Sequence, residues 1–194
     1  MAYTTTALVK TYAGISSTGD DTLIGTLVTR AQAVIDLFTQ RTFESATATR
    51  RFTVGEDTDG SWLYFDADIC SITTVTNKAD ATTTETISST EYVTQPRNTT
   101  PYYAIKILDG ANKYWDYATD PEMGVTVAGN WAYSTAAPNT IVQAATRLAT
   151  YFYKQRDADV FDVTALPDAG VITVPQGIPA DVKLMLAPYK RMVA

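Results

Sequence analysis

The feature that most constrains the fold is a change in hydrophobic periodicity along the 194 residues. Near both ends, apolar residues recur at the spacing of a helix, whereas the middle consists of short extended runs separated by turn residues. Threonine, whose β-branched side chain favours strands over helices, is concentrated between Thr47 and Thr100. The pattern predicts an α+β fold, in which a small helical bundle formed by the N- and C-terminal helices carries an inserted antiparallel β region.

We expect a single domain over residues 1–194. Its helical core comprises residues 1–44 and 138–194, and its β insertion comprises residues 45–137. Within the core, residues 157–177 contain two prolines and two glycines, which predicts an extended arm. A chain of this length can bury about 70% of its unfolded surface as one domain.

Four helices are predicted from capping residues and apolar spacing. Thr4 or Thr5 can cap a short helix that ends at Gly14, and Asp20–Asp21 provide the N-cap of a longer helix that runs to Arg41. Pro138 suits the first turn of a third helix, which runs to about residue 156. Pro179 opens a last short helix over residues 180–185.

The middle of the chain predicts six strands, each bounded by turn residues. They are Arg50–Val54, Ser61–Phe65, Ile72–Lys78, Tyr92–Gln95, Ala104–Leu108 and Gly124–Ala128. Turns are expected at residues 57–60, 77–83, 109–110 and 119–121.

The composition excludes much of enzyme chemistry. Histidine is absent, so serine–histidine–aspartate and cysteine–histidine mechanisms are excluded. Cys70 is the single cysteine, which excludes an internal disulfide and leaves too few thiolates for a zinc or iron–sulfur site. Neither GxxxxGK(S/T) nor GxGxxG occurs. We therefore expect no enzymatic activity, no catalytic, metal or cofactor-binding residue, and no cofactor.

A calcium loop is suggested by the spacing of four aspartates, but the detail does not fit. They are Asp157, Asp159, Asp162 and Asp168. Counted from the first, positions six and twelve hold aspartate, where an EF-hand requires glycine and glutamate. We interpret this segment as a solvated acidic loop.

The net charge of −6 argues against tight nucleic-acid binding, because phosphate neutralisation needs clustered lysine and arginine. No run approaches the roughly 18 to 20 apolar residues of a membrane-spanning helix. The start, Met1–Thr5, lacks the basic and apolar regions of a signal peptide. The sequence therefore predicts a soluble protein that stays in the cytoplasm.

Several ordered motifs carry a family resemblance. Tyr12–Ile15 and Asp20–Leu23 precede a helix that closes on Ile35–Phe43, Val125–Trp131 leads to Pro138, and Ile178–Arg191 ends the chain with an "IPADV...LAPYKR" pattern. Together they resemble the head-tail connector (head-completion adaptor) family of tailed phages, in its longer form with a β insertion. Ala132 and Gln40 depart from the family pattern, since glycine is usual there.

The resemblance implies a structural subunit, without catalytic residues, of a dodecameric ring beneath the portal. DNA passes through the lumen without sequence-specific binding, and a stopper or tail-completion protein docks below. The implied partners are therefore further copies of this chain, the portal protein and the stopper. The implied location is the head-tail interface of the virion, after assembly in the host cytoplasm.

Two sets of residues are candidate contacts in such a ring. The basic C-terminal end of the chain is expected to contact the portal through Tyr189, Lys190, Arg191, Met192 and Val193. Charged residues of the two long helices that lie off the main apolar stripe are expected to contact neighbouring subunits. They are Arg30, Asp36, Arg41 and Arg156.

Two other function classes remain open from the sequence. A carbohydrate- or surface-binding β module of a tail accessory protein is suggested by aromatic residues in the middle of the chain, which could stack on sugars. They are Trp62, Tyr64, Phe65, Tyr102, Tyr103, Tyr114, Trp115 and Tyr117. A glycosidase is suggested by the pair Asp66 and Asp68. Glycan binding, cell-wall hydrolysis and ring formation distinguish the three classes.

Overall fold

The structure, a computed structural model, describes residues 3–158, 164–166, 170–172 and 177–191. The chain divides into two compact units. The first, here called the helical unit, comprises residues 1–41 and 137–194, and the second, the β unit, comprises residues 42–136. Helices from both chain ends pack together and an antiparallel sheet is inserted between them in the sequence, so the predicted α+β fold is confirmed.

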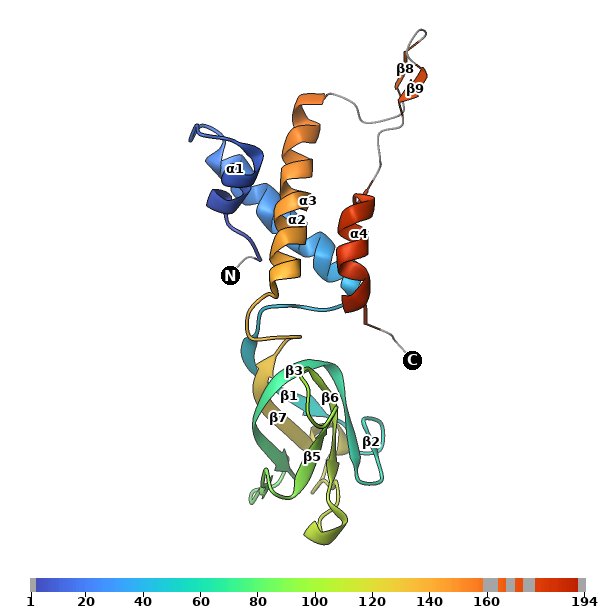
Figure 1. The fold of residues 1–194 in the computed structure, drawn as a ribbon. Helices are drawn as coiled ribbons and strands as arrows, with labels where there is room; N and C mark the ends of the chain where they lie inside the picture. Colours follow the sequence, from blue (N-terminus) through green and yellow to red (C-terminus); the bar gives the residue numbers. More distant parts are fainter. Residues whose placement is uncertain (1–2, 159–163, 167–169, 173–176, 192–194) are drawn as a thin grey trace. The chain divides into compact units, whose positions relative to one another are not determined.

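The helical unit has two layers. Helices α1 (Thr6–Ala13), α3 (Asn139–Ala158) and α4 (Ala180–Leu186) pack on α2 (Asp21–Thr39), and Figure 1 shows α3 and α4 in front of α2. The buried side of α2 follows the predicted apolar spacing, with Ile24, Leu27, Val28, Ala31 and Ile35. None of the helices in the described part of the chain is long and apolar enough to cross a bilayer.

Capping was predicted correctly for α1 and only partly for α2. The Thr5 hydroxyl accepts the Leu8 N–H at 3.2 Å, and Gly14 ends α1 with a φ of 71°. Asp20 does occupy the N-cap position of α2, but its side chain makes no capping bond there. Gln40 ends α2 in the left-handed conformation that glycine usually takes, with a φ of 54°.

The extended arm predicted over residues 157–177 is described only in part. Helix α3 reaches Ala158, and β8 (Thr164–Leu166) pairs with β9 (Gly170–Ile172) in a short antiparallel hairpin. Residues 159–163, 167–169 and 173–176 lie outside the described residues.

The β unit contains a seven-stranded antiparallel sheet in the order β1-β7-β3-β6-β5, with β2 and β4 also paired to β3. The strands are β1 (Ala46–Phe52), β2 (Thr58–Asp59), β3 (Trp62–Asn77), β4 (Glu85–Ile87), β5 (Tyr92–Gln95), β6 (Tyr102–Ile107) and β7 (Val125–Trp131). Its core is a cluster of aromatic and branched aliphatic side chains that includes Phe52, Phe65, Ile69, Val127 and Trp131.

The prediction of two strands over residues 61–65 and 72–78 was wrong, because both belong to the 16-residue strand β3. The strand β3 is continuous and changes its pairing partner along its length. It pairs with β6 up to Ile69 and with β7 from Ile69 onward, and the register shifts between Tyr64 and Ile69. Such irregularities bend a strand without ending it.

Candidate assembly surfaces

The predicted portal-contact segment begins at Tyr189, the last residue of the 3₁₀ helix η3 (Ala187–Tyr189), which directly follows α4. The backbone N–H of Arg191 donates to the Thr39 carbonyl at 2.8 Å, and the Lys190 ammonium lies 5.9 Å from the centroid of the Phe38 ring. The start of the segment is therefore attached to the C-terminal end of α2, with Lys190 itself exposed. Met192–Val193 lie outside the described residues.

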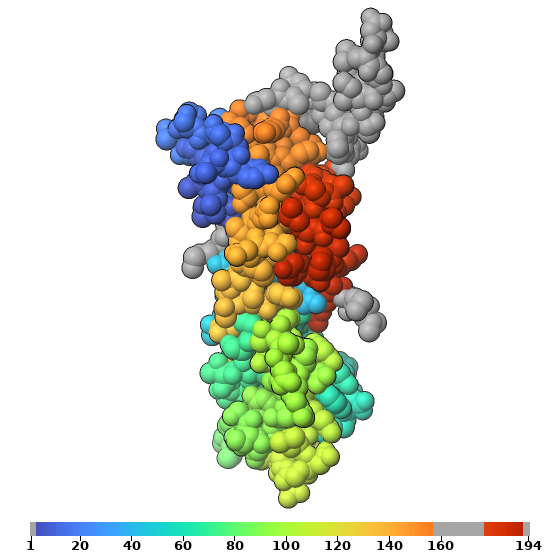
Figure 2. All heavy atoms as spheres, viewed as in Figure 1, coloured from blue at the N-terminus to red at the C-terminus, as the bar shows by residue number. Residues whose placement is uncertain are grey.

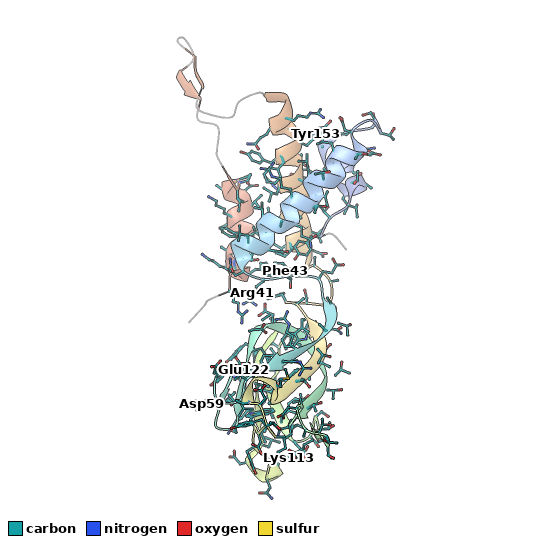
Figure 3. All side chains as sticks on the ribbon, turned by 180° about the vertical axis from the view of Figure 1, so that it is seen from behind. Arg41, Phe43, Asp59, Lys113, Glu122 and Tyr153 are labelled. Atoms are coloured by element: carbon teal, nitrogen blue, oxygen red, sulfur yellow. The ribbon has the colours of Figure 1, made fainter. Side chains whose placement is uncertain are left out.

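Arg156 is held in a polar junction between α3 and the start of α2. The Tyr153 hydroxyl donates to Asp20 Oδ2 at 2.6 Å, and the Arg156 guanidinium donates to Asp20 Oδ1 at 3.1 Å (Tyr153 is labelled in Figure 3). These bonds, the one from Tyr153 first, lower the pKa of Asp20, and the same carboxylate raises the pKa of Tyr153. Asp20 thus joins α2 to α3 instead of capping α2.

Of the other three predicted inter-subunit residues, Arg30 and Asp36 lie on α2 and Arg41 lies just beyond its C-terminal end. The Arg30 guanidinium carbon is 4.6 Å from the centroid of the Phe152 ring on α3. Asp36 accepts a hydrogen bond from the Tyr3 hydroxyl, and burial raises the pKa of this carboxyl although that bond opposes the shift. Arg41 is half-buried just beyond α2. Arg30 and Arg156 therefore contact adjacent aromatic residues of α3, whereas Asp36 and Arg41 lie at the other end of α2.

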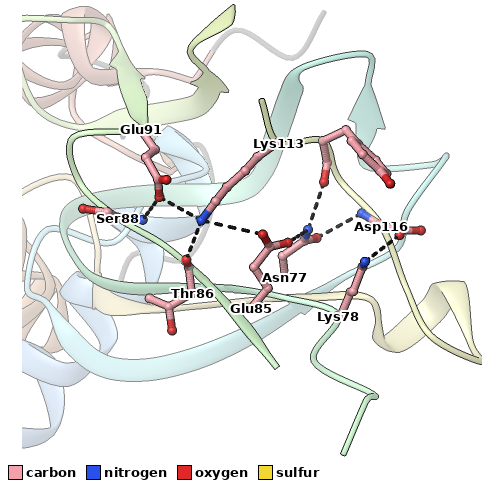
Figure 4. A network of polar contacts seen from close by, with 9 residues as sticks. Asn77, Lys78, Glu85, Thr86, Ser88, Glu91, Lys113 and Asp116 are labelled. Carbon is pink, nitrogen blue, oxygen red and sulfur yellow. Dashed lines mark hydrogen bonds and ion pairs between the residues drawn. The ribbon is translucent and has the colours of Figure 1, made fainter. Parts of the chain in front are cut away.

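A polar network in the β unit was not predicted from the sequence (Figure 4). The Lys113 ammonium lies 3.0 Å from a Glu91 carboxylate oxygen, 3.6 Å from a Glu85 carboxylate oxygen and 3.1 Å from the Thr86 carbonyl. The fully buried Asn77 amide donates to Glu85 at 3.0 Å. The network fastens the segment around Lys113 to β3 and β4, so we interpret it as structural.

Asn77 and Asp80 hold the rest of the same long connection. Asn77 donates to the Tyr114 carbonyl at 2.9 Å and accepts the Asp116 N–H at 3.0 Å. The Asp80 carboxylate accepts the backbone N–H groups of residues 118, 119 and 120. Those bonds, with the one from Ala118 first, lower the pKa of Asp80 to about 2.

The aromatic residues proposed as a sugar platform do not share one environment. Trp115 is buried and its indole N–H donates to the Ser61 carbonyl at 3.0 Å, and Phe65 belongs to the core. Trp62 and Tyr64 stack with ring centroids 6.2 Å apart, and Tyr114 is 66% exposed.

The acidic residues considered for a glycosidase or a calcium site also lie in different environments. Asp66 is exposed and pairs with Arg50 at 2.8 Å, whereas Asp68 is buried. Of the four aspartates considered for calcium, three (residues 159, 162 and 168) lie outside the described residues. Within the part of the chain that the structure describes, no group of three or more acidic or cysteine side chains could hold a metal ion.

No protein-family model matches the sequence, and no curated protein matches it. The fold, however, has relatives among solved structures. It is shared with a chain in the neck of a gene transfer agent particle. In that structure, the neck of an empty particle computed with C6 symmetry, the TM-score is 0.60 at 15% identity, over 97% of this chain and 90% of that chain.

A second similar chain occurs in the virion of a native gene transfer agent particle. Its TM-score is 0.58 at 15% identity, with the same coverage of both chains. The likeness therefore includes the helical unit, the β unit and the order in which the sequence joins them.

Proposed function

We propose that this chain is a structural head-tail connector (adaptor) subunit that forms a ring beneath the portal of a phage or phage-like particle. The ring gives DNA a conduit and gives stopper or tail proteins a docking platform, without catalysis. The observation that carries the proposal is the likeness of 97% of the chain to chains of a gene transfer agent neck and virion. The motifs that resemble head-tail connectors support it independently.

The copy number follows from the resemblance and agrees with the symmetry of the similar neck. We propose a dodecameric ring, and such a ring obeys the six-fold symmetry used for that neck. Closed rings of identical chains require heterologous interfaces, in which one face of a subunit meets a different face of the next. We place part of that interface on Arg30, Asp36, Arg41 and Arg156.

The distribution of charge suits a conduit that does not retain DNA. The β unit has thirteen acidic and six basic residues, a formal net charge of −7, whereas the helical unit has eight acidic and nine basic residues, a net charge of +1. An acidic surface repels phosphate and gives no basis for sequence-specific binding. This division supports passage of DNA through the lumen.

We propose that residues 189–193 make the portal contact. An aromatic residue, two cations and two apolar residues occur together here in an otherwise acidic protein. Because the Arg191 backbone is bonded to Thr39, the start of the segment is fixed at the C-terminal end of α2. The simpler reading is that the two cations only complement a helix C-terminus, which contributes about 0.3–1 kcal/mol.

The double variant Lys190→Glu, Arg191→Glu distinguishes a portal contact from a role limited to the helix C-terminus. The backbone bond to Thr39 is kept, so we expect a loss of folding stability below about 1 kcal/mol. Particles assembled with the variant should accumulate as DNA-filled heads that leak or lack tails in electron micrographs. Lys183→Glu, at an exposed cation on α4, is the matched control and should give normal tails. Normal tail attachment by the double variant at wild-type copy number would place the portal contact elsewhere.

A further inference from the structure

A groove of about 300 Å³ lies where α1, α3 and α4 meet in the helical unit. Figure 2 shows α3 between α1 and α4 on this face. The lining combines apolar surface with a few polar groups: Tyr12, Arg147, Thr150, Tyr151, Lys154, Pro179, Asp181 and Val182. Arg147 pairs with Asp181, and the buried Thr150 hydroxyl donates to the Thr146 carbonyl at 2.8 Å. The groove can therefore accept an apolar side chain without leaving these groups unsatisfied.

The groove opens on the side of α3 that faces away from α2. Phe152 marks the opposite side, since its ring contacts Arg30 of α2. Thr150 and Lys154 stand two residues before and after Phe152, and two residues correspond to a rotation of about 200° around a helix. These two groove residues are therefore directed away from α2.

The outer side of α2 carries an exposed apolar side chain, Leu37, which is 73% exposed. It follows the buried Val28 by nine residues, about two and a half helical turns, so it points away from the packed side of α2. In Figure 3, seen from behind, α2 lies in front of α3. Leu37 and the groove are thus on opposite sides of the helical unit.

The surface around Leu37 is suited to a dry contact. Five of the six exposed positions on this side of α2 carry no charge: Thr22, Thr26, Thr29, Ala33 and Leu37. The sixth, Arg30, lies two turns before Leu37, and its guanidinium packs over the Phe152 ring of α3. The hydroxyls of Thr26 and Thr29 donate to backbone carbonyls one turn earlier, at 3.2 Å each. Exposed helix faces normally carry charged residues, whereas the cores of protein interfaces are depleted of them.

We propose that Leu37 of one copy of this chain inserts into the α1–α3–α4 groove of the next copy, an inference that rests on the proposed ring. Leu37 and the groove lie on opposite sides of one helical unit, so Leu37 cannot reach the groove of its own chain. A two-fold contact joins the same surface of two copies, so a contact around Leu37 would leave the groove empty. A head-to-tail contact places Leu37 of each copy in the groove of the next copy and can close a ring.

Charge complementarity supports the same occupant. Lys154 is exposed at the groove and forms no ion pair with an acidic residue of 3–156 or 177–191. Asp36, the residue before Leu37, is the only acidic residue in the last two turns of α2. Insertion of Leu37 brings the Asp36 carboxylate toward Lys154 of the neighbouring copy. This pairing assigns Asp36 to the interface, with α2 of one copy facing the groove of the next.

Site-directed cross-linking tests the direction of the contact. In a Cys70→Ser background, Leu37→Cys and Lys154→Cys are introduced together and treated with a short bismaleimide. We expect a ladder of products beyond the dimer from the double variant, and no products from either single variant. An equal mixture of the single variants should stop at the dimer. Dimers from Leu37→Cys alone, or no products from the double variant, would overturn the proposal.

A charge substitution separates this contact from the ring itself. Leu37→Asp should lower the association constant at least tenfold in sedimentation analysis, with an unchanged melting temperature because the side chain is exposed. Leu184→Asp, at the 77% exposed Leu184 of α4, is the matched control and should associate like the wild type. Rings that persist in Leu37→Asp overturn this contact and leave the proposed function intact. A wild-type chain that forms neither rings nor cross-links, alone or with its portal, overturns both.

Discussion

Gly129 lies in the middle of β7, where β3 shifts its register and the two backbones approach closely. A Cβ atom at this position would overlap the Ser71 carbonyl oxygen and come within 2.8 Å of Ile69 Cδ1. Glycine is therefore required by space and not by backbone conformation. The same residue belongs to the Val125–Trp131 sequence motif, so glycine at this position of the motif has a physical reason.

The variant Gly129→Ala should lower the free energy of unfolding by about 2–3 kcal/mol, because the added methyl group must displace β3 backbone. Urea denaturation of the purified chain measures this. Gly110→Ala is the control, since a Cβ added there would meet no atom within 4 Å, and it should change stability by less than about 0.5 kcal/mol. Equal stability of the two variants would show that β3 and β7 do not approach this closely.

Single residues were predictable from the sequence where their role is local. The Thr5 cap and the Gly14 terminator depend only on neighbours within four residues, and both were predicted correctly. Local spacing also predicted that Asp20 caps α2. Its side chain instead binds Tyr153 and Arg156, which are more than 130 positions away. Partners this distant leave no signal in local spacing.

At the level of elements, periodicity predicted the four helices better than the strands. Helical spacing extends over many residues, so α2 and α3 were found within two or three residues of their ends. The strands β2 and β4 have two and three residues, too few for a period-2 pattern, and both were missed. The sequence predicted only turns in the long connection before β7, because the side chains that hold this connection, Asn77 of β3 and Asp80, lie far from it in the sequence.

That connection predicts a dependence of stability on acid. Asp80 has a pKa of about 2 in the folded chain, below the ordinary value of 3.8, because backbone N–H groups bind its carboxylate. A lowered folded-state pKa adds stability above about pH 4, and this contribution is lost as the pH falls toward 2. Asp80→Asn should therefore be less stable than the wild type at pH 6, with a difference that shrinks between pH 4 and pH 2.

Thermal unfolding followed by circular dichroism over this pH range measures the difference. Glu56→Gln, which changes an exposed acid outside these contacts, should follow the wild type throughout. A gap between Asp80→Asn and the wild type that stays constant down to pH 2 would mean that the carboxylate does not hold the connection.

For the whole molecule, the sequence predicted the fold class and the order of its parts, because composition changes sharply at both borders of the β region. It did not show that the two units differ in charge by eight, since that count requires the borders found in the structure. Nor did it show Leu37 and the groove on opposite sides of the helical unit, because the groove combines three helices from both chain ends.

The central claim is that copies of this chain close into a ring, and negative-stain electron microscopy of the purified protein, alone and mixed with its portal, tests it most directly. We predict closed rings with an open lumen in at least one of the two samples, and twelve subunits in their class averages. Monomers in both samples, or open filaments without closed rings, would contradict the claim.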